Sequence, residues 1–287
     1  MQADIFDTPR LLQRREAAAA DFTAVDYLKR DATALLADRL CDLTQRFPLV
    51  LDVGCHTGQL KEMLTADAGV EQVIACDSSA NMLRQTHGMR VQIPPERLPF
   101  AEASFDAVVS AASLHHTNDL VGMLTQMRRL LKPDGIMLCV MPGPESFYEL
   151  RNSFAAVEAR YGEMRPHFSP FPEIRDAGNL LQRCGYALPV ADQTLTHIEY
   201  GDPLTLMREL KQMGEANALI SRDRRFYPKR WLQEVCAHYR EHYATPEGRV
   251  QATVEWITLT ARAPDARVQQ QPAKRGSGNV DLKQFLH

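Results

Sequence analysis

Between residues 48 and 141 the sequence alternates short apolar runs with amphipathic segments. The runs "LVLDVG", "EQVIACD", "MRVQI", "FDAVVSAAS" and "IMLCVM" have the length and composition of buried β-strands. Segments between them, such as "GQLKEMLTAD" and "DLVGMLTQMRRLL", repeat apolar residues at helical spacing, and "KPDG" at 132–135 predicts a turn. Continuous apolar strands separated by helices predict parallel βαβ units with both sheet faces covered. Because such crossovers are right-handed, we expect a doubly wound α/β sheet.

The segments on either side of this stretch predict further elements. Residues 10–46, 145–161 and 173–184 repeat apolar residues at helical spacing. Residues 186–200 and 251–263 alternate enough to form a closing pair of edge strands. The fold class that we expect is therefore α/β, with a mostly parallel sheet of seven strands.

Residues 203–243 separate the last two predicted strands by roughly 40 residues of helical pattern, where ordinary connections have a few. We therefore expect an insertion that covers one end of the sheet as a lid. Gln, Pro, Gly and Ser are frequent after residue 264, which indicates disorder. The expected parts are N-terminal helices at 1–47, a Rossmann-like core at 48–200, a helical lid at 201–250, the last core strand at 251–263 and a disordered tail at 264–287.

The composition narrows the compartment and the class of partner. Lys and Arg number 33 against 36 Asp and Glu, a net charge of −3, so no basic excess favours nucleic acid. The six cysteines contain no CxxC pair, which indicates free thiols in a reducing compartment rather than a disulfide framework or a zinc site. No apolar stretch approaches the ~20 residues of a membrane span, and the first residues lack the apolar region of a secretion signal. We expect a soluble cytoplasmic protein.

The ends of the predicted strands carry the residues suited to a ligand, because open α/β sheets bind ligands there. The first strand ends at Asp52 and is followed by Gly54 and Gly58, which permit a turn with positive φ and a close approach to the backbone. The second ends in Asp77, an acid placed to bind the hydroxyls of a ribose. Small residues at the end of the fourth strand leave room for a ligand.

The loop after the first strand, "GCHTGQ", has neither the dinucleotide fingerprint G-x-G-x-x-G nor the phosphate loop G-x-x-x-x-G-K-[ST]. Together with "LPFAEASFDAVVS", "LHHTNDL" and "LLKPDGIM", in this order, it resembles the class I S-adenosylmethionine methyltransferases. The resemblance implies S-adenosylmethionine as cofactor. It also implies the residues that contact this cofactor: Asp52, Gly54, Cys55, His56, Gly58, Asp77, Ser78, Met82, Leu98, Ser110 and Ala111.

Segments outside that domain narrow the resemblance. They are "IFDTPRLLQRREAAA", "VDYLK", "FYELRNSF", "HFSPFPEIRDAGNLLQRCGY" and "LMRELKQMGEAN". From about residue 4 to about residue 262 the chain resembles the methyltransferase-fold assembly factors of respiratory complex I, in animals called complex I assembly factor 5. That family is described as hydroxylating an arginine of the iron–sulfur subunit nearest the quinone site. The implied partner is that subunit, and the implied place is the cytoplasm, or the matrix side of the inner membrane in a mitochondrial host. More distantly, the chain is similar to malonyl-acyl-carrier-protein methyltransferases of biotin synthesis.

Two residues depart from the methyltransferase pattern. His56 replaces the middle glycine of the loop, and Pro94 stands where an aspartate near the adenine amino group is usual. A histidine enters the left-handed region at a cost of ~1 kcal/mol, but we expect its ring to crowd the adenosyl group. Pro94 removes one hydrogen-bond acceptor, which corresponds to ~1 kcal/mol, or about fivefold in affinity. The sequence therefore predicts weak binding of S-adenosylmethionine.

The sequence assigns no catalytic residue, but it offers four candidates: His115, His116, Tyr148 and His167. His115 and His116 follow the fourth strand, where either one would act as a general base or contact the substrate. Alternatively, they start a helix that Asn118 or Asp119 caps.

Tyr148 begins a predicted helix and either orients the substrate or belongs to a solvated first turn. His167 lies in "HFSPF", which either lines the pocket or packs as the hinge of a lid. The basic run "RDRRFYPKR" at 222–230 is either a solvated face or a docking surface for an acidic partner or a membrane edge. Hydroxylation commonly uses non-haem iron, but no arrangement of two histidines and a carboxylate is legible, and we expect no metal site.

Three hypotheses about function follow. The first is an enzyme of the complex I assembly family that acts on a protein arginine. The second is a conventional methyltransferase of a small molecule or an acyl-carrier protein. The third is a non-catalytic assembly chaperone that keeps a weakened cofactor site. The segments outside the methyltransferase domain favour the first hypothesis over the second, while His56 and Pro94 favour the third.

Overall fold

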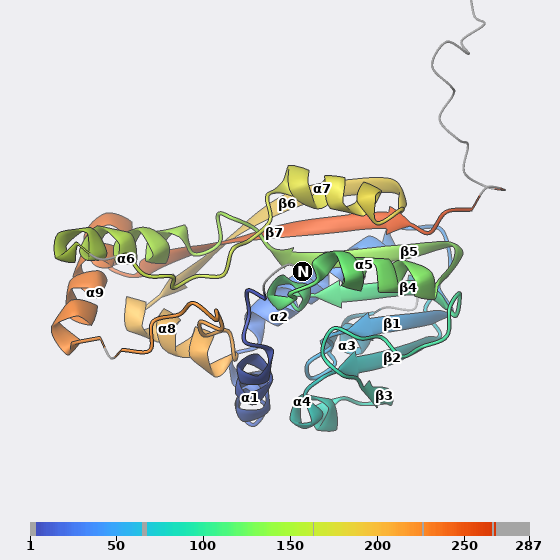
Figure 1. The fold of residues 1–287 in the computed structure, drawn as a ribbon, viewed down its shortest axis with the longest axis horizontal. Helices are drawn as coiled ribbons and strands as arrows, with labels where there is room; N and C mark the ends of the chain where they lie inside the picture. The colour runs from blue at the N-terminus through green and yellow to red at the C-terminus, as the bar shows by residue number, and fades with distance from the viewer. Residues whose placement is uncertain (1–3, 65–67, 163, 226, 266, 268–287) are drawn as a thin grey trace, which may run out of the picture.

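The structure is a computed structural model (Figure 1), and it describes residues 4–64, 68–162, 164–225, 227–265 and 267. Most of the tail that the sequence predicts to be disordered, 264–287, lies outside these residues. In the part of the chain that is described, no helix is long and apolar enough to cross a membrane.

Within the described residues a seven-stranded sheet forms the centre of the fold, with the order β3-β2-β1-β4-β5-β7-β6. The first five strands pair with one another in parallel, while β7 runs antiparallel to both β5 and β6. The predicted doubly wound, mostly parallel sheet is confirmed. The strands are β1 (Leu49–Val53), β2 (Gln72–Asp77), β3 (Met89–Gln92), β4 (Phe105–Ala111), β5 (Leu131–Pro142), β6 (Ala187–Tyr200) and β7 (Val250–Arg262).

One of the two predicted edge strands does not lie at an edge. β7 pairs with β5 through Thr258 and Val140 on one side, and with β6 through Trp256 and Thr194 on the other. The prediction that 251–263 forms an edge strand is therefore wrong. The physical reason is burial: nearly every residue of β7 is buried, whereas β6 alternates between half-buried and exposed residues along much of its length. A strand covered on both faces carries apolar side chains on both.

Helices cover both faces of the sheet (Figure 1). Their starts follow local capping chemistry: the Asp7 carboxylate accepts a hydrogen bond from the Arg10 N–H at the start of α1, and the Asp119 carboxylate accepts one from the Gly122 N–H at the start of α5. The helices are α1 (Thr8–Ala18), η1 (Phe22–Ala24), α2 (Tyr27–Cys41), α3 (Gln59–Met63), α4 (Ala80–Gln85), η3 (Leu114–His116), α5 (Leu120–Leu130), α6 (Tyr148–Tyr161), α7 (Ile174–Arg183), α8 (Pro203–Gln212) and α9 (Lys229–Tyr243).

Alternate residues of the central strands face two separate cores. In β1, Leu51 packs in the core with Met127 of α5 and Leu181 of α7, while Val50 packs in the core with Leu36 of α2. All five side chains are fully buried. The carboxyl ends of the parallel strands are thus held between two packed layers, and the loops that follow them start from fixed positions.

The predicted helical insertion at 203–243 is helical only in α8 and α9. Residues 213–225 between them form a loop. Near its start, Gly214 has a positive φ of 87°. This loop is tied to the start of the chain, where Phe6 and Leu219 form an antiparallel bridge. β6 and β7 extend beyond the parallel part of the sheet and carry α6, α8 and α9 (Figure 1). The loop therefore lies beside the N-terminal segment, not on a separate helical body.

Two shorter elements also differ from the sequence prediction. α3 ends at Met63, earlier than predicted, because the following residue, Leu64, is extended. The predicted turn at 132–135 lies inside β5, which begins at Leu131 and bends at Asp134 (φ 61°). A register shift in the pairing of β4 with β5 accompanies this bend. Residues that favour a tight turn here form a bulge within a longer strand.

Candidate functional site

The loop between β1 and α3 turns at two glycines. Gly54 and Gly58 have φ angles of 68° and 87°. A Cβ atom on Gly54 would lie 1.9 Å from Oγ of Ser113, and one on Gly58 would lie 2.6 Å from Cγ2 of Thr86. Cβ atoms essentially never approach another atom within 3.0 Å, so both positions need glycine. His56, between them, also adopts the left-handed conformation, with a φ of 51°.

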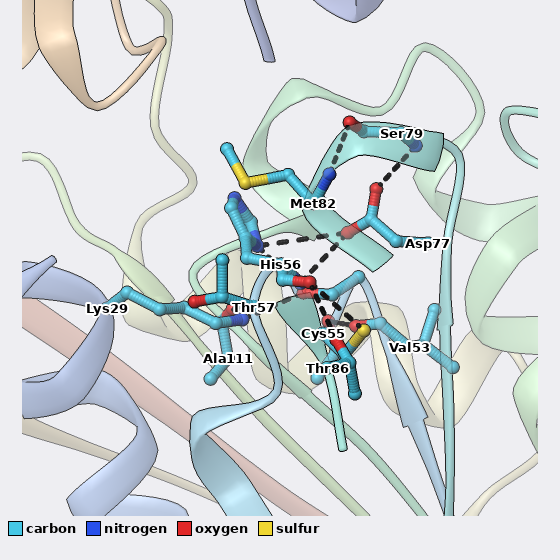
Figure 2. Close-up of polar contacts among 12 residues, drawn as sticks. Lys29, Val53, Cys55, His56, Thr57, Asp77, Ser79, Met82, Thr86 and Ala111 are labelled. Atoms are coloured by element: carbon cyan, nitrogen blue, oxygen red, sulfur yellow. Dashed lines mark hydrogen bonds and ion pairs between the residues drawn. The ribbon is translucent and has the colours of Figure 1, made fainter. Parts of the chain in front are cut away.

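Asp77, the last residue of β2, holds this loop in place (Figure 2). Its Oδ2 accepts a hydrogen bond from the backbone N–H of His56 at 3.0 Å, and its Oδ1 accepts one from the N–H of Ser79 at 2.8 Å. The residue is only 1% exposed. Because a carboxylate oxygen can accept two hydrogen bonds, this acid orders the loop and retains acceptor capacity for a ligand.

Lys29 of α2 joins the loop to the end of β4. Its Nζ donates to the carbonyl oxygens of Gly54 and Ala111, both at 2.7 Å (Figure 2). Burial lowers the pKa of Lys29, although Asp52 opposes this shift. Burial also raises the pKa of Asp52 to about 6, although Lys29 opposes that shift. Lys29 and Asp52 are therefore a buried cation and a buried acid next to this loop.

The His56 ring packs against the backbone of its own loop and against η1. Its Nδ1 lies 2.9 Å from the carbonyl oxygen of Gly54, and its ring stacks on Phe22 with the centroids 5.3 Å apart. Burial lowers the pKa of His56 to about 3, and Lys29 adds to this effect. The neutral ring thus donates from Nδ1 to the loop and forms part of the wall of a large cavity.

A small cavity of about 70 Å³ lies beside the loop. Small-molecule sites enclose roughly 300–1,000 Å³, so in this conformation the cavity does not enclose a nucleoside cofactor. α1 forms its outer wall through Leu11 and Leu12, and the His56 ring takes no part in it. Four of the residues that the sequence analysis discusses in relation to the cofactor line this cavity. They are Gly54, Asp77, Ser78 and Pro94.

Other residues that the resemblance assigns to the cofactor are packed inside the fold. Met82 and Leu98 belong to the two cores on opposite faces of the sheet. Cys55 lies in a small buried cluster behind the loop. The hydroxyl of Ser110 donates to the carbonyl oxygen of Val53 and so joins β4 to β1. In this conformation these side chains support the site from behind.

Arg15 of α1 is a charged residue that the sequence did not single out. It is 6% exposed and lines the small cavity. Its Nε and Nη2 atoms have no hydrogen-bond partner among the described residues. A buried donor without a partner costs ~1–3 kcal/mol, so such donors are rarely left unused. Arg15 is therefore placed to bind an anionic group that enters this cavity.

A larger cavity, of about 320 Å³, shares His116 with the small one. Residues of the β1 loop, η3, α6, α8 and the loop after α8 surround it. Its polar wall includes the carboxylates of Asp26 and Glu215. Its apolar wall is rich in aromatic side chains: Phe22, Phe147, Phe154, Phe168, Phe171 and Trp256.

His115, His116 and Glu215 form a cluster in the wall of this cavity. The Oε2 atom of Glu215 lies 3.0 Å from Nε2 of His115 and 3.4 Å from Nδ1 of His116. The other nitrogen of His116, Nε2, lies 3.1 Å from the hydroxyl of Ser169. Burial lowers the pKa of His116 to about 3, and His115 adds to this effect. Burial alone would raise the pKa of Glu215, but His116 and His115 hold it below its usual value.

His167, the third histidine candidate, also lines the large cavity. Its Nε2 lies 2.6 Å from Oε1 of Glu158, an ion-pair geometry among aromatic rings. Tyr148 is not among the described residues that line this cavity. Its ring packs edge-on against Tyr243. Its neighbour Glu149 does not belong to a solvated turn, because it is buried and accepts hydrogen bonds from Thr253.

The structure thus brings three of the four catalytic candidates to one cavity, and Asp119 does cap the helix that follows His115 and His116. Sequence reasoning missed Glu215 and Lys29. Glu215 lies in a segment predicted to be helical, with no local sign of a role. Lys29 had a signal, because it occupies the buried face of α2 beside the apolar positions.

The sequence of this chain is similar to proteins of known families. Residues 51–139 match the family described as a methyltransferase domain. The chain is 36% identical to "Arginine-hydroxylase NDUFAF5, mitochondrial" of Danio rerio, over 97% of this chain and 88% of that protein. It is 32% identical to a malonyl-[acyl-carrier protein] O-methyltransferase of Methylovorus, over 93% of this chain and 94% of that protein.

A solved structure supports the same fold. It is phosphoethanolamine N-methyltransferase 2 of Haemonchus contortus in complex with S-adenosyl-L-methionine, with a TM-score of 0.53 and 15% identity. The match covers 86% of this chain and 57% of that one. At this identity the likeness shows the fold alone. With the family match, it confirms the predicted class I methyltransferase fold.

Proposed function

The chain belongs to the family of the NDUFAF5 arginine hydroxylases and carries a methyltransferase domain, and from this premise we propose that it hydroxylates an arginine of a protein substrate. The substrate that we propose is the iron–sulfur subunit of respiratory complex I nearest the quinone site, modified during assembly of the complex. The observation that carries this proposal is the large cavity, which combines aromatic walls with the carboxylates of Asp26 and Glu215 beside the methyltransferase loop.

An arginine side chain suits this cavity. Its guanidinium is flat, always charged, and stacks on aromatic faces, while its stem is apolar. Phe22 and Trp256 supply aromatic surface to the cavity, and Asp26 is also one of its lining residues. Asp26 already accepts hydrogen bonds from Nε of Arg30, at 2.9 and 3.0 Å, and from Nε2 of Gln59 at 3.1 Å, so a substrate guanidinium would share this carboxylate with them. The cavity therefore supports binding of an extended side chain supplied by a protein.

Hydroxylation of a C–H bond requires an oxidant and electrons from outside the chain. With dioxygen as the oxidant, one oxygen atom enters the C–H bond and the other leaves as water. An external organic reductant supplies the two electrons and two protons that balance the reaction. The residues of this chain bind and orient the arginine, and the aromatic walls exclude bulk water from it.

We propose that S-adenosylmethionine binds between the β1 loop and α1. Asp77 would bind the ribose hydroxyls, and the unpartnered nitrogens of Arg15 would bind the carboxylate. When bound, this cofactor supplies a methyl group activated by a sulfonium. The small cavity has to widen first, and displacement of Leu11 and Leu12 on α1 is the direct way to widen it. The residues fit the cofactor on condition that α1 moves.

The basic run at 222–230 contributes little to the choice of partner. Arg222 lies 3.0 Å from the carboxylate of Asp7, and Arg225 lies 2.9 Å from that of Asp223. Arg165 contacts Asp223 as well, at 3.0 Å. Acidic neighbours therefore offset part of the positive charge of this run. We base the proposed partner on the cavity and not on an association with a membrane surface.

Methyl transfer to a malonyl carrier protein is the second candidate function. Its support is the 32% identity to a malonyl-[acyl-carrier protein] O-methyltransferase, only slightly below the identity to the hydroxylases. A substrate with a free carboxylate would need a cation, and Lys211 of α8 lies in the cavity wall. Lys29 also lies there, but its ammonium already donates to two carbonyl oxygens.

Mass spectrometry of the quinone-site iron–sulfur subunit, from cells with and without this gene, tests the proposal. Hydroxylation predicts one additional oxygen on an arginine only when the gene is present. An additional methyl group there would indicate a protein methyltransferase instead. An unmodified subunit together with normal complex I would contradict the proposal. Biotin auxotrophy of the deletion strain, with normal complex I, would favour the malonyl substrate.

A further inference from the structure

We propose that His115, His116 and Glu215 form a binding site for one divalent transition-metal ion, with iron(II) as the ion that the ligand set favours. This proposal departs from the sequence-based expectation of no metal site. Metal binding as such rests on the cluster alone. Only its use in arginine hydroxylation rests on the proposed function.

The distances in the cluster match those between neighbouring ligands of a metal ion. The three residues offer ligand atoms that all lie within 4.8 Å of one another. Ligand atoms about 2.1 Å from a metal ion lie about 3.0 Å apart in octahedral geometry and about 3.4 Å apart in tetrahedral geometry. The Oε2 atom of Glu215 lies 3.0 Å from Nε2 of His115 and 3.4 Å from Nδ1 of His116. An ion can therefore bind with small side-chain movements.

Two rigid pieces of backbone hold the ligands. His115 and His116 are consecutive residues of η3, directly after β4, and their ring centroids lie 4.1 Å apart. Glu215 follows the end of α8, where its N–H donates to the carbonyl oxygen of Leu210. Arg14 of α1 donates to the backbone oxygens of the two residues after Glu215. The backbone at Glu215 is thus tied to α8 and to α1, and the two histidines are held in η3.

The surroundings of His116 have the character of an outer shell around a metal site. Ligating histidines generally use their second nitrogen in a hydrogen bond that fixes the tautomer. Nε2 of His116 lies 3.1 Å from Oγ of Ser169, so a proton on Nε2 leaves Nδ1 free as a ligand atom.

A plain network of hydrogen bonds explains the cluster less completely. The Nδ1 atoms of His115 and His116 are buried, and neither makes a hydrogen bond to the described residues. In a structural network buried nitrogens of this kind are normally satisfied. A metal ion bound to Nδ1 of His116 would give one of these two nitrogens a partner. It would also neutralise the carboxylate of Glu215, which hydrogen bonds to neutral imidazoles do not.

The ligand set indicates which metal it would bind. Two histidines and one carboxylate are the donor set of non-haem iron(II) oxygenases, which keep open positions for other ligands. The set lies in the wall of the large cavity that we assign to the arginine. His116 also lines the small cavity that we assign to the cofactor. The proposed ion would therefore lie between the two ligand positions.

Titration of the chelator-treated, tag-free full chain with cobalt(II) under nitrogen tests the site, because bound cobalt(II) absorbs visible light. Iron(II) is then titrated in the same way by calorimetry. We expect one ion per chain for the wild type. Glu215→Gln and His116→Gln should each weaken binding at least ~100-fold, beyond the range of outer-shell changes. Ser169→Ala, an outer-shell change, should weaken it about tenfold.

His238 and His242 of α9 supply the matched control, because they are a second pair of neighbouring histidines, with rings 4.0 Å apart, that lies outside the proposed site. His242→Gln should leave the cobalt(II) affinity of the wild type unchanged. Circular dichroism establishes that each variant is folded, and Ser169→Ala still tests the site if the ligand variants do not fold. Absence of binding in the wild type, or binding that survives Glu215→Gln and His116→Gln, overturns the proposal. Metal binding without any hydroxylated arginine in cells would overturn the proposed function and leave the site standing.

Discussion

The ammonium nitrogen of Lys29 lies 2.7 Å from the carbonyl oxygen of Gly54, so a cation on α2 holds the loop that follows β1. The same nitrogen lies 2.7 Å from the carbonyl oxygen of Ala111, at the end of β4. One buried charge thereby fixes the relative position of two strand ends. Because the proposed cofactor and substrate positions meet at these ends, Lys29 supports the geometry of both.

Replacing Lys29 by methionine should lower the free energy of unfolding by about 1–3 kcal/mol, the cost of a buried acceptor without a partner. The carbonyl oxygen of Ala111 would lose its donor, whereas that of Gly54 would keep the His56 ring nitrogen at 2.9 Å. Urea denaturation at pH 7 measures the change. Lys229→Met, at an exposed position, serves as the control and should stay within about 0.5 kcal/mol of the wild type. Equal or greater stability of Lys29→Met would show that desolvation of the ammonium outweighs its hydrogen bonds.

The local sequence was sufficient for the parallel strands and for the β1 loop. Gly54, Gly58 and Asp77 lie within 24 residues of one another, and their spacing alone predicts a turn facing the next strand end. Glu215 could not be found this way, because it reaches the site from a position 100 residues after His115. Lys29 likewise contacts Ala111 across 82 residues of sequence. Contacts of this range depend on how the helices pack, which no local pattern records.

The order of the last strands shows a different limit. Residues 186–200 and 251–263 both have high β propensity, and alternation alone does not distinguish an edge strand from an interior one. The distinguishing feature is the exposure of the charged side chains. β6 carries Asp192 and Glu199, whereas Glu255 of β7 is buried and accepts a hydrogen bond from the backbone N–H of Glu145. A buried acid with a distant partner is not visible in the sequence.

Arg15→Met should separate ligand binding from stability. The variant keeps an apolar stem of similar length but removes the unpartnered nitrogens of a buried guanidinium. Stability of the ligand-free protein should therefore stay equal or rise, while affinity for S-adenosylmethionine falls roughly ten- to a hundredfold, corresponding to ~1.5–3 kcal/mol. Calorimetric titration and thermal melts measure the two effects. Arg10→Met, exposed on the same helix, should change neither. Unchanged affinity in Arg15→Met would remove Arg15 from the cofactor site.

Gly54→Ala should disrupt the loop, because its Cβ would lie 1.9 Å from Oγ and 2.4 Å from Cβ of Ser113. We expect a loss of several kcal/mol in unfolding free energy, from this overlap and the positive φ. Ser113→Gly in the same chain should recover the part due to overlap and leave about 1 kcal/mol from backbone strain. Ser113→Ala should recover less, since it keeps the Cβ atom. Equal recovery by both variants would place the conflict elsewhere.

His56 should make the protein less stable in mild acid. Burial, with Lys29 adding to it, lowers the pKa of His56 in the folded state from 6.5 to about 3. Below pH 6.5 the unfolded chain therefore binds a proton at this ring that the folded chain does not. Above pH 6.5 this ring does not reduce the unfolding free energy. As the pH falls from 6.5 towards 3, the unfolding free energy decreases by ~1.4 kcal/mol per pH unit. Asp52 acts in the opposite direction between pH 3.8 and about 6, because burial raises its pKa.

His56→Asn isolates this contribution, since asparagine also tolerates the φ of 51° and Asp52 remains in both proteins. We expect the unfolding free energy of the wild type to fall by about 2 kcal/mol more than that of the variant between pH 7 and pH 5. Urea denaturation at the two pH values gives the difference, in which Asp52 and the other shared groups cancel. The carboxylate of Asp77, 3.9 Å from the ring, favours a charged His56, and so does the carbonyl oxygen of Gly54. Equal pH dependence in the two proteins would mean that Asp77 keeps the ring protonated and that burial does not control it.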